Sequence, residues 1–343
     1  MKAEARCAEE VKARCAEEAK AKCAEEAEAR CAGEAEARYP KELKKGATVG
    51  IIAPCSCISP ERAKQCREVL VSMGFQVKEA DNLATNYAGY MAGKGDVRGQ
   101  WINEMFADPE VDAIFCIRGG DGGSRAMEYV DLDLVKKNPK IFVGYSDVTS
   151  LHLAFTQQCG LVTFHGPMVS SNMVDQFDPE TRESFFQALN AEEGYEFKNP
   201  RGFEISVLKE GQAEGVLTGG NLSLLSASIG TPYEVDAKGR ILFIEEIGEP
   251  LCRMERSVYH LRNAGKFRDC AGVILGQFTS CANKDDAEYT EIDCFLDALE
   301  GLDIPVLYNV QSGHGFPMMT LPLGAVCSID TAKPGIAFAP PRR

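Results

Sequence analysis

Long apolar runs are missing from this sequence, and so are the signals that direct a chain to a membrane. No stretch of about 18 consecutive apolar residues occurs, so we expect no membrane-spanning segment. The first residues, MKAEARCAEE, lack the apolar centre of a secretory signal. These absences predict a cytoplasmic protein that has no membrane partner.

Histidine is scarce, and the usual patterns of metal sites are absent. The four histidines include no H-x-x-x-H pair, and no second Cys/His pair accompanies Cys55 and Cys57. Their C-x-C spacing is also too short for most local disulfides. We therefore expect the 14 cysteines to be mainly reduced, structural thiols, and we expect neither a metal nor a cofactor. A metal or disulfide role is the alternative.

Positive charge is in deficit, with 37 Lys and Arg against 51 Asp and Glu and a net charge of −14. An acidic chain repels phosphate backbones, which excludes nucleic acid as an expected partner. The composition is otherwise that of an ordinary globular protein, because 45% of residues are hydrophobic and 26% are charged. A length of 343 residues is enough for two domains with their own cores.

An octapeptide repeat occupies residues 7–38, where CAEEVKAR, CAEEAKAK, CAEEAEAR and CAGEAEAR follow one another. Its composition favours helix, and pairs such as Glu10 and Arg14 add weak i,i+4 support. Eight residues turn a helix about 80° past two full turns, so the cysteines spiral around it and form no coiled-coil seam. We predict a solvated helical tail over residues 1–38. A tail for oligomerisation or redox linkage is the alternative.

Short apolar segments alternate with helical patterns after the tail. The helical pattern at 59–74 has Ser59 as N-cap and Gly74 at its end. The pattern at 95–108 places Val97, Trp101 and Met105 on one face. This alternation predicts a parallel α/β sheet, whose strands we expect at 47–54, 75–80, 111–117 and 140–144.

Changes in composition divide the rest of the chain. Residues 173–204 are polar and irregular apart from one helical stretch, so we interpret them as a linker. We predict a first α/β domain over 39–172 and a second domain over 205–343.

A glycine-rich segment, CIRGGDGGSR at 116–125, follows one predicted strand. Ligands of parallel sheets bind at the carboxyl ends of strands. Four glycines within 119–123 leave the backbone free to present N–H groups to an anion or an oxyanion. The alternative interpretation is a flexible turn.

The segment VGYSDVT follows the next strand and presents Ser146 at a strand-to-helix turn. Such turns expose the nucleophile of many hydrolases. The sequence departs from the hydrolase pattern G-x-S-x-G because Val148 occupies the last position. Ser146 is therefore a candidate nucleophile or, alternatively, the cap of a helix that begins at residue 147.

A serine nucleophile needs a base, and the base needs an orienting acceptor. His152 and His260 lie in helical patterns, whereas His165 follows a strand within FHGPM. His314 lies between glycines in QSGHGF, which leaves room for a substrate, and we favour it as the base.

An acceptor for that base occurs in ILFIEEIGEP, which ends an apolar strand with Glu245 and Glu246. A buried carboxylate is costly unless it is paired, so Glu245 is the candidate acceptor. The alternative is an exposed pair of glutamates that opens a turn.

These motifs together resemble one family. RGGDG, VGYSDVTSLHLAF, FHGPM, TGGNLSLL, ILFIEEIGEP, GVILGQF, SGHG and TLPLGA occur in this order over residues 116–326. With VGIIAP ahead of them, the chain resembles the LD-carboxypeptidase family of serine peptidases over roughly residues 45–335. The microcin-C-immunity hydrolases belong to the same group. The resemblance implies a flavodoxin-like N-terminal domain and a smaller α/β C-terminal domain.

The resemblance also implies a Ser–Glu–His triad of Ser146, Glu245 and His314. It implies that the oxyanion is bound by the backbone N–H groups of Gly120 and Asp147. The activity implied is removal of a terminal D-residue, commonly D-Ala, from a cytoplasmic peptidoglycan tetrapeptide. No metal takes part in that activity, and the enzymes are commonly homodimers.

Substrate binding is assigned less directly. Arg118 and the amides of the glycine-rich segment, from Gly119 to Asp121, are candidates to hold the C-terminal carboxylate of a peptide. Many relatives have tyrosine where this sequence has Asp121, which puts the shape and charge of the pocket in question.

Three other functions remain open. A microcin-immunity-type hydrolase would cut an amide beside an acyl-adenylate-like group and would favour an aromatic side chain that stacks on adenine. A non-catalytic scaffold that binds muropeptides would use the tail as its working part. An amidotransferase-like enzyme would fit the sheet, but its chemistry needs a cysteine where Ser146 stands.

Overall fold

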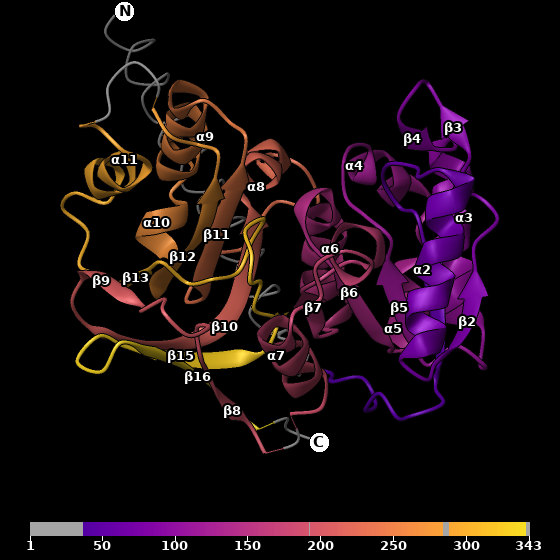
Figure 1. Ribbon diagram of the computed structural model, residues 1–343. Coiled ribbons are helices and arrows are strands. Elements are labelled where there is room, and N and C mark those ends of the chain that lie inside the picture. Colours follow the sequence, from indigo (N-terminus) through magenta and orange to yellow (C-terminus); the bar gives the residue numbers. More distant parts are fainter. Residues whose placement is uncertain (1–36, 192, 284–287, 341–343) are drawn as a thin grey trace, which may run out of the picture. The chain divides into compact units, whose positions relative to one another are not determined.

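The computed structural model describes residues 37–191, 193–283 and 288–340. The predicted tail helix falls almost entirely outside them. Residues 37–343 belong to one unit, in which two sheets carry helices against their faces (Figure 1). Within the described residues, no helix is both long and apolar enough to cross a membrane.

The first sheet has six strands in the order β14-β7-β6-β5-β1-β2. Five of them are parallel and have the order 2-1-3-4-5 along the chain, which is that of flavodoxin-like sheets. Strand β14 closes one edge antiparallel to β7. The bounds are β1 Thr48–Ile52, β2 Gln76–Glu79, β5 Ala113–Cys116, β6 Ile141–Gly144, β7 Thr163–His165 and β14 Leu321–Leu323. The predicted parallel α/β sheet is confirmed.

Helices and short turns connect these strands. Helix α2 begins as predicted, because the Ser59 hydroxyl accepts a hydrogen bond from Arg62 N at 3.1 Å, and Gly74 follows its end with a φ of +92°. The elements between the strands are α2 Pro60–Ser72, β3 Asn86–Tyr87, β4 Met91–Ala92, α3 Gly95–Ala107, α4 Gly123–Ala126, η1 Met127–Tyr129, α5 Leu132–Lys137, η2 Ser146–Val148, α6 Thr149–Cys159 and the π-helical η3 Val169–Met173.

Helix α3 buries only part of the predicted face. Met105 is fully buried and Trp101 packs partly buried against the core, but Val97 is 37% exposed. Ile102 and Phe106 are also fully buried, so the buried face extends to one side of the predicted one. Gly99 lies on that side, where a Cβ atom would lie 2.5 Å from Tyr129 Cβ.

The second sheet has eight strands in the order β8-β16-β15-β10-β11-β12-β13-β9. Its central strands β10 to β13 are parallel, and antiparallel strands extend both sides. The bounds are β8 Tyr195–Phe197, β9 Ser206–Lys209, β10 Gln212–Asn221, β11 Ile241–Ile247, β12 Gly272–Thr279, β13 Val306–Tyr308, β15 Val326–Asp330 and β16 Gly335–Phe338. Its helices are α8 Leu222–Ser228, α9 Leu251–Asn263, α10 Lys266–Asp269 and α11 Glu291–Ala298.

The stretch interpreted as a linker contributes to both sheets. Helix α7, Pro179–Leu189, packs on the first sheet, where the buried Phe185 meets Phe115 edge to face at 5.5 Å. Strand β8 instead pairs with β16 of the second sheet. Strand β14 returns from late in the sequence to the first sheet. The two layers are therefore interwoven near their shared boundary.

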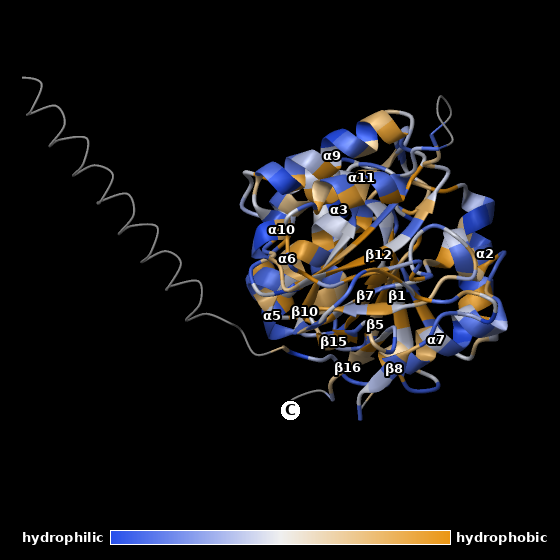
Figure 2. Cartoon of the chain, turned by 90° about the vertical axis from the view of Figure 1, so that its left-hand side faces the viewer, coloured by the Kyte–Doolittle hydropathy of each residue, from blue (hydrophilic) through white to orange (hydrophobic). Residues whose placement is uncertain are grey.

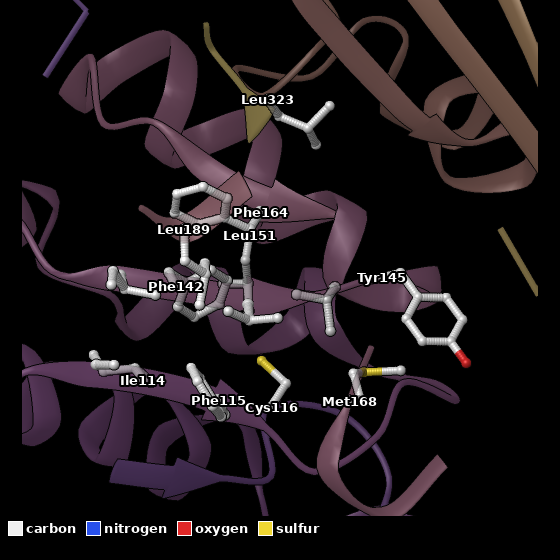
Figure 3. Packing of buried hydrophobic residues seen from close by; sticks show 14 of the residues in the cluster. Ile114, Phe115, Cys116, Phe142, Tyr145, Leu151, Phe164, Met168, Leu189 and Leu323 are labelled. Atoms are coloured by element: carbon white, nitrogen blue, oxygen red, sulfur yellow. The ribbon is translucent and has the colours of Figure 1, made fainter. Parts of the chain in front are cut away.

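Apolar strands fill the interior of the unit. Figure 2 shows hydrophobic colour on the inner strands and hydrophilic colour on the outward surfaces of the helices around them. Figure 3 shows Ile114, Phe142 and Phe164 within the core of the first sheet. Tyr145 lies at the edge of this group with its hydroxyl pointing away from it (Figure 3). This edge is where β6 ends, immediately before Ser146.

Candidate active site

Ser146 has a strained backbone at the end of β6. Its φ is +66°, a value that costs a side-chain-bearing residue roughly 1–2 kcal/mol. Its hydroxyl makes no hydrogen bond within the described residues, and neither η2 nor α6 has a side-chain cap. The helix-cap interpretation is therefore wrong. Strain of this kind is typical of a nucleophile presented at a strand-to-helix turn.

The glycine-rich segment lies against this serine. A Cβ atom on Gly119 would lie 2.8 Å from Ser146 Cβ, 3.0 Å from Ser146 Oγ and 3.3 Å from Asp147 N. Only glycine allows two loops to approach this closely. The segment follows β5, next to the point where the strand order reverses between β1 and β5, which is where such sheets bind ligands.

Two backbone donors near Ser146 are unoccupied. In the part of the chain that the structure describes, the N–H groups of Gly120 and Asp147 donate no hydrogen bond. The Asp147 side chain is engaged instead, because its Oδ2 accepts from Gly123 N at 2.6 Å. Burial raises the pKa of the Asp147 carboxyl. Unpaired amides beside a serine are suited to stabilising an oxyanion.

The side chains of Glu245 and His314 form a close, largely buried contact. Glu245 lies near the carboxyl end of β11 with no exposed surface, and its Oε2 lies 2.6 Å from His314 Nδ1. Burial raises the pKa of the Glu245 carboxyl, while the imidazole next to it acts in the opposite direction. The His314 ring meets the Tyr145 ring at 4.8 Å, which brings the pair beside the residue that precedes Ser146. Nδ1 is thus occupied, and Nε2 is left for proton transfer.

The neighbouring Glu246 has a different task. Its carboxylate accepts hydrogen bonds from Asn221 Nδ2, from Ser223 N and Oγ, and from Ile247 N. These bonds attach β11 to the first turn of α8. Both glutamates are buried, so the alternative of an exposed pair is wrong.

Gln277 positions the His314 loop and was missed by the sequence analysis. Its Oε1 accepts from Gly315 N at 2.7 Å, and its Nε2 donates to Pro317 O at 3.3 Å. A Cβ atom on Gly315 would lie 2.5 Å from Gln277 Nε2. The available signal was a polar residue near the end of the apolar run GVILGQF.

The other histidines lie away from Glu245. His152 is buried, with its ring nitrogens bonded to Thr163 Oγ1 and Gly144 O, and burial lowers its pKa to about 4. His165 is fully buried between Tyr145 and Phe243, and burial lowers its pKa well below the ordinary range. His260 is exposed and contacts Ser226.

The predicted substrate-binding residues belong to the loop after β5, of which Gly119 lies against the serine. Arg118 and Asp121 are exposed, and within the described residues neither side chain forms an ion pair or a hydrogen bond. Gly119 is buried against Ser146. A guanidinium without a partner at the rim of a site can receive a carboxylate.

In the described ranges 37–191, 193–283 and 288–340, no three or more His, Cys, Asp or Glu side chains are grouped so that they could hold a metal ion. The ten cysteines in these ranges are free, and most are buried. Burial raises the pKa of thiols such as Cys66, to about 11, which keeps them protonated and unreactive.

A strained serine with free amides beside it, and a histidine bonded to a buried carboxylate, are the parts of a serine hydrolase on a two-sheet α/β fold. The chain belongs to the LD-carboxypeptidase family, because the N-terminal domain of that family matches residues 49–166 and its C-terminal domain matches residues 214–329. It is therefore a serine-type peptidase.

The similarity to three known proteins extends over most of the chain. A probable murein peptide carboxypeptidase of Bacillus subtilis is 40% identical over 299 residues, which cover 86% of this chain and 92% of that protein. A muramoyltetrapeptide carboxypeptidase from Oxalobacter formigenes has a TM-score of 0.75 and 28% identity, covering 85% of this chain and 98% of that one. The Escherichia coli microcin C7 self-immunity protein, solved in complex with aspartyl sulfamoyl adenosine, has a TM-score of 0.80 and 26% identity, covering 88% and 98%.

Proposed function

We propose that this enzyme removes the terminal D-residue, D-Ala, from cytoplasmic muropeptides during peptidoglycan recycling, and that it works as a homodimer. Ser146, His314 and Glu245 form the catalytic triad. The names of the similar murein and muramoyltetrapeptide carboxypeptidases support this substrate class.

The contact between His314 Nδ1 and Glu245 Oε2 carries the proposal. At 2.6 Å it holds the imidazole in one tautomer, with Nε2 available as a base. The Glu245 carboxylate is fully buried, so water screens its charge little. It therefore stabilises the imidazolium that forms when His314 takes a proton. Within the described residues, Glu245 Oε2 is bonded to His314, and the buried Oε1 atom has no hydrogen-bond partner.

The chemistry follows from these positions. Ser146 Oγ attacks the carbonyl carbon of the L,D-peptide bond, and His314 Nε2 takes the hydroxyl proton. The Gly120 and Asp147 N–H groups bind the oxyanion, each contributing about 3–4 kcal/mol to the transition state. The proton then passes from His314 to the leaving amine of the D-residue. Water then attacks the acyl carbon while His314 Nε2 takes its proton, and that proton passes to Ser146 Oγ as the ester bond breaks and the shortened peptide leaves as a carboxylic acid.

Recognition of the leaving residue follows from charge. A carboxypeptidase must bind a free α-carboxylate next to the scissile bond. The exposed Arg118 guanidinium directly precedes the glycine-rich segment and has no protein partner among the described residues. We assign it to the carboxylate of the terminal D-residue.

Ser146→Ala tests the proposal. We expect the variant to lose D-Ala release from an L,D-tetrapeptide by about 10⁴-fold or more, with an unchanged thermal unfolding midpoint. Covalent labelling by a fluorophosphonate should disappear in parallel. Wild-type turnover by Ser146→Ala would disprove the triad. A wild-type enzyme with neither turnover nor labelling would favour the scaffold interpretation.

The microcin-type reaction is the second candidate, and the structural similarity to the microcin C7 self-immunity protein favours it. That reaction needs an exposed aromatic side chain near the site. The linker aromatics do not offer one, because Phe177 and Phe186 pack on Phe185, and Tyr195 stacks on Phe338. Phe316 is 43% exposed and follows His314 by two positions, so it is the aromatic candidate for stacking. Parallel assays on a tetrapeptide and on an aminoacyl-sulfamoyl adenosine separate the two reactions, and we expect the tetrapeptide to be the better substrate.

A further inference from the structure

Ser56 lies in the loop after β1 and contacts the glycine-rich segment on both sides of Gly120. It is 5% exposed. Its backbone N–H donates to Gly119 O at 3.2 Å, and its Oγ accepts from Asp121 N at 3.1 Å. Each of these bonds ends on one of the two peptide units that flank Gly120.

The first bond determines where the Gly120 N–H points. The carbonyl of Gly119 and the N–H of Gly120 belong to the same peptide unit, which is trans. In a trans peptide these two groups point in opposite directions. Because Gly119 O faces Ser56, the Gly120 N–H faces away from Ser56 and stays free of protein acceptors among the described residues.

The second bond holds the next peptide unit, because the Ser56 hydroxyl accepts from Asp121 N. Both peptide units that meet at Gly120 are therefore tied to Ser56, which fixes the Cα positions about which the Gly119–Gly120 unit would turn. Space is also limited, because a Cβ atom on Gly120 would lie 2.2 Å from Ser56 Oγ. Gly120 has a φ of +104°, which favours glycine. Ser56 and Gly120 therefore fit each other as a unit.

Other side chains hold the segment further along. Arg98 donates to Gly122 O at 2.6 Å, and Asp147 Oδ2 accepts from Gly123 N. Neither contact involves the peptide that carries the Gly120 N–H. The orientation of that peptide therefore depends on its contact with Ser56.

We propose that Ser56 is a positioning residue that orients the Gly120 amide toward the oxyanion. This inference rests on the proposed function and deepens it. The loop after β1 then contributes to catalysis through the backbone of the loop after β5, without touching substrate.

Ser56→Ala tests the part of the positioning that the side chain supplies. It releases Asp121 N and opens space beside Gly120, so that the Gly119–Gly120 peptide is held by the backbone bond alone. We expect kcat for tetrapeptide cleavage to fall about 10- to 100-fold while KM changes less than about threefold. A boronic acid that carries the acyl half of the substrate forms a tetrahedral adduct on Ser146. Its affinity should fall by a factor similar to that in kcat/KM, whereas the affinity for the cleaved tripeptide should not change.

Ser59→Ala is the matched control. Ser59 Oγ also accepts one backbone N–H at 3.1 Å, from Arg62, but it caps α2 and does not reach the glycine-rich segment. We expect this variant to lower the thermal unfolding midpoint and to keep wild-type kcat and boronate affinity.

Three outcomes distinguish the possibilities. If Ser146→Ala abolishes turnover and Ser56→Ala keeps wild-type kcat and boronate affinity, the positioning role is wrong and the triad stands. If substrate and boronate affinity fall equally in Ser56→Ala and Ser59→Ala, Ser56 is merely structural and the inference is overturned. If Ser146→Ala keeps turnover, the proposed function and this inference both fail.

Discussion

The two halves of the candidate site are built in different ways. The first sheet supplies Ser146 and the glycine-rich segment, where strained or side-chain-free backbone creates the geometry. The second sheet supplies Glu245 and His314, where a buried carboxylate and an imidazole create it. The first half depends on shape and the second on charge, so substitutions should affect them differently.

Glu245→Gln should have the largest effect and acts on the charged half. The amide cannot ionise, and it can donate to His314 Nδ1, which stabilises the wrong tautomer. We expect kcat for tetrapeptide cleavage to fall about 10³- to 10⁴-fold. Steady-state kinetics check this, and a loss below about tenfold would remove Glu245 from the triad.

The pH dependence of the free energy of unfolding tests the half of the site on the first sheet, which depends on shape. His152 Nε2 donates to Gly144 O, just before the Ser146 turn, and burial lowers the pKa of its ring to about 4 from an ordinary 6.5. As pH falls from 6.5 to 4, the unfolded chain takes up the proton first. The contribution of His152 is therefore complete above pH 6.5 and decreases by about 3 kcal/mol toward pH 4. Urea unfolding at several pH values should show this loss, and His152→Gln should reduce it.

Glu246→Gln tests whether the two adjacent glutamates have different roles. The amide group would place N–H donors against the N–H and O–H donors of Asn221 and Ser223. We expect the free energy of unfolding in urea to fall by about 2 kcal/mol, with kcat within about threefold of wild type. A kcat loss as large as that of Glu245→Gln would contradict the division of roles.

Gln277→Leu releases the loop of His314 without touching the Glu245 contact. We expect kcat to fall about tenfold because the imidazole is held less precisely. Addition of Glu245→Gln should then cost less than it does alone, because both changes act on one side chain. Full additivity of the two effects would argue against this role.

Ser146→Gly should change stability by the smallest amount, and the change should be stabilising. Glycine adopts a φ of +66° without the strain that a side chain brings. We expect Ser146→Gly to exceed Ser146→Ala in free energy of unfolding by about 1 kcal/mol, although both are inactive. Equal stability of the two variants would show that the turn is unstrained.

Local patterns made much of the fold predictable. The short apolar runs at β1, β5 and β6, the Ser59 cap of α2 and the order of motifs all depend on neighbouring residues. The prediction was incomplete where packing adds to periodicity, as in α3, where Met105 is buried as expected, Val97 is exposed, and Gly99 meets Tyr129. The linker interpretation could not show that α7 and β8 join different sheets, because strand pairing depends on distant segments.

The sequence by itself determined the alternation of strands and helices, the family resemblance, and Ser146, Glu245 and His314 as candidates. Periodicity, capping and motif order are local properties that can be read in one dimension. Tertiary structure decided which of two adjacent glutamates meets a histidine 69 positions away, and that Ser56 and Gln277 hold the loops. These contacts depend on how closely the backbone segments approach one another, which no local pattern records.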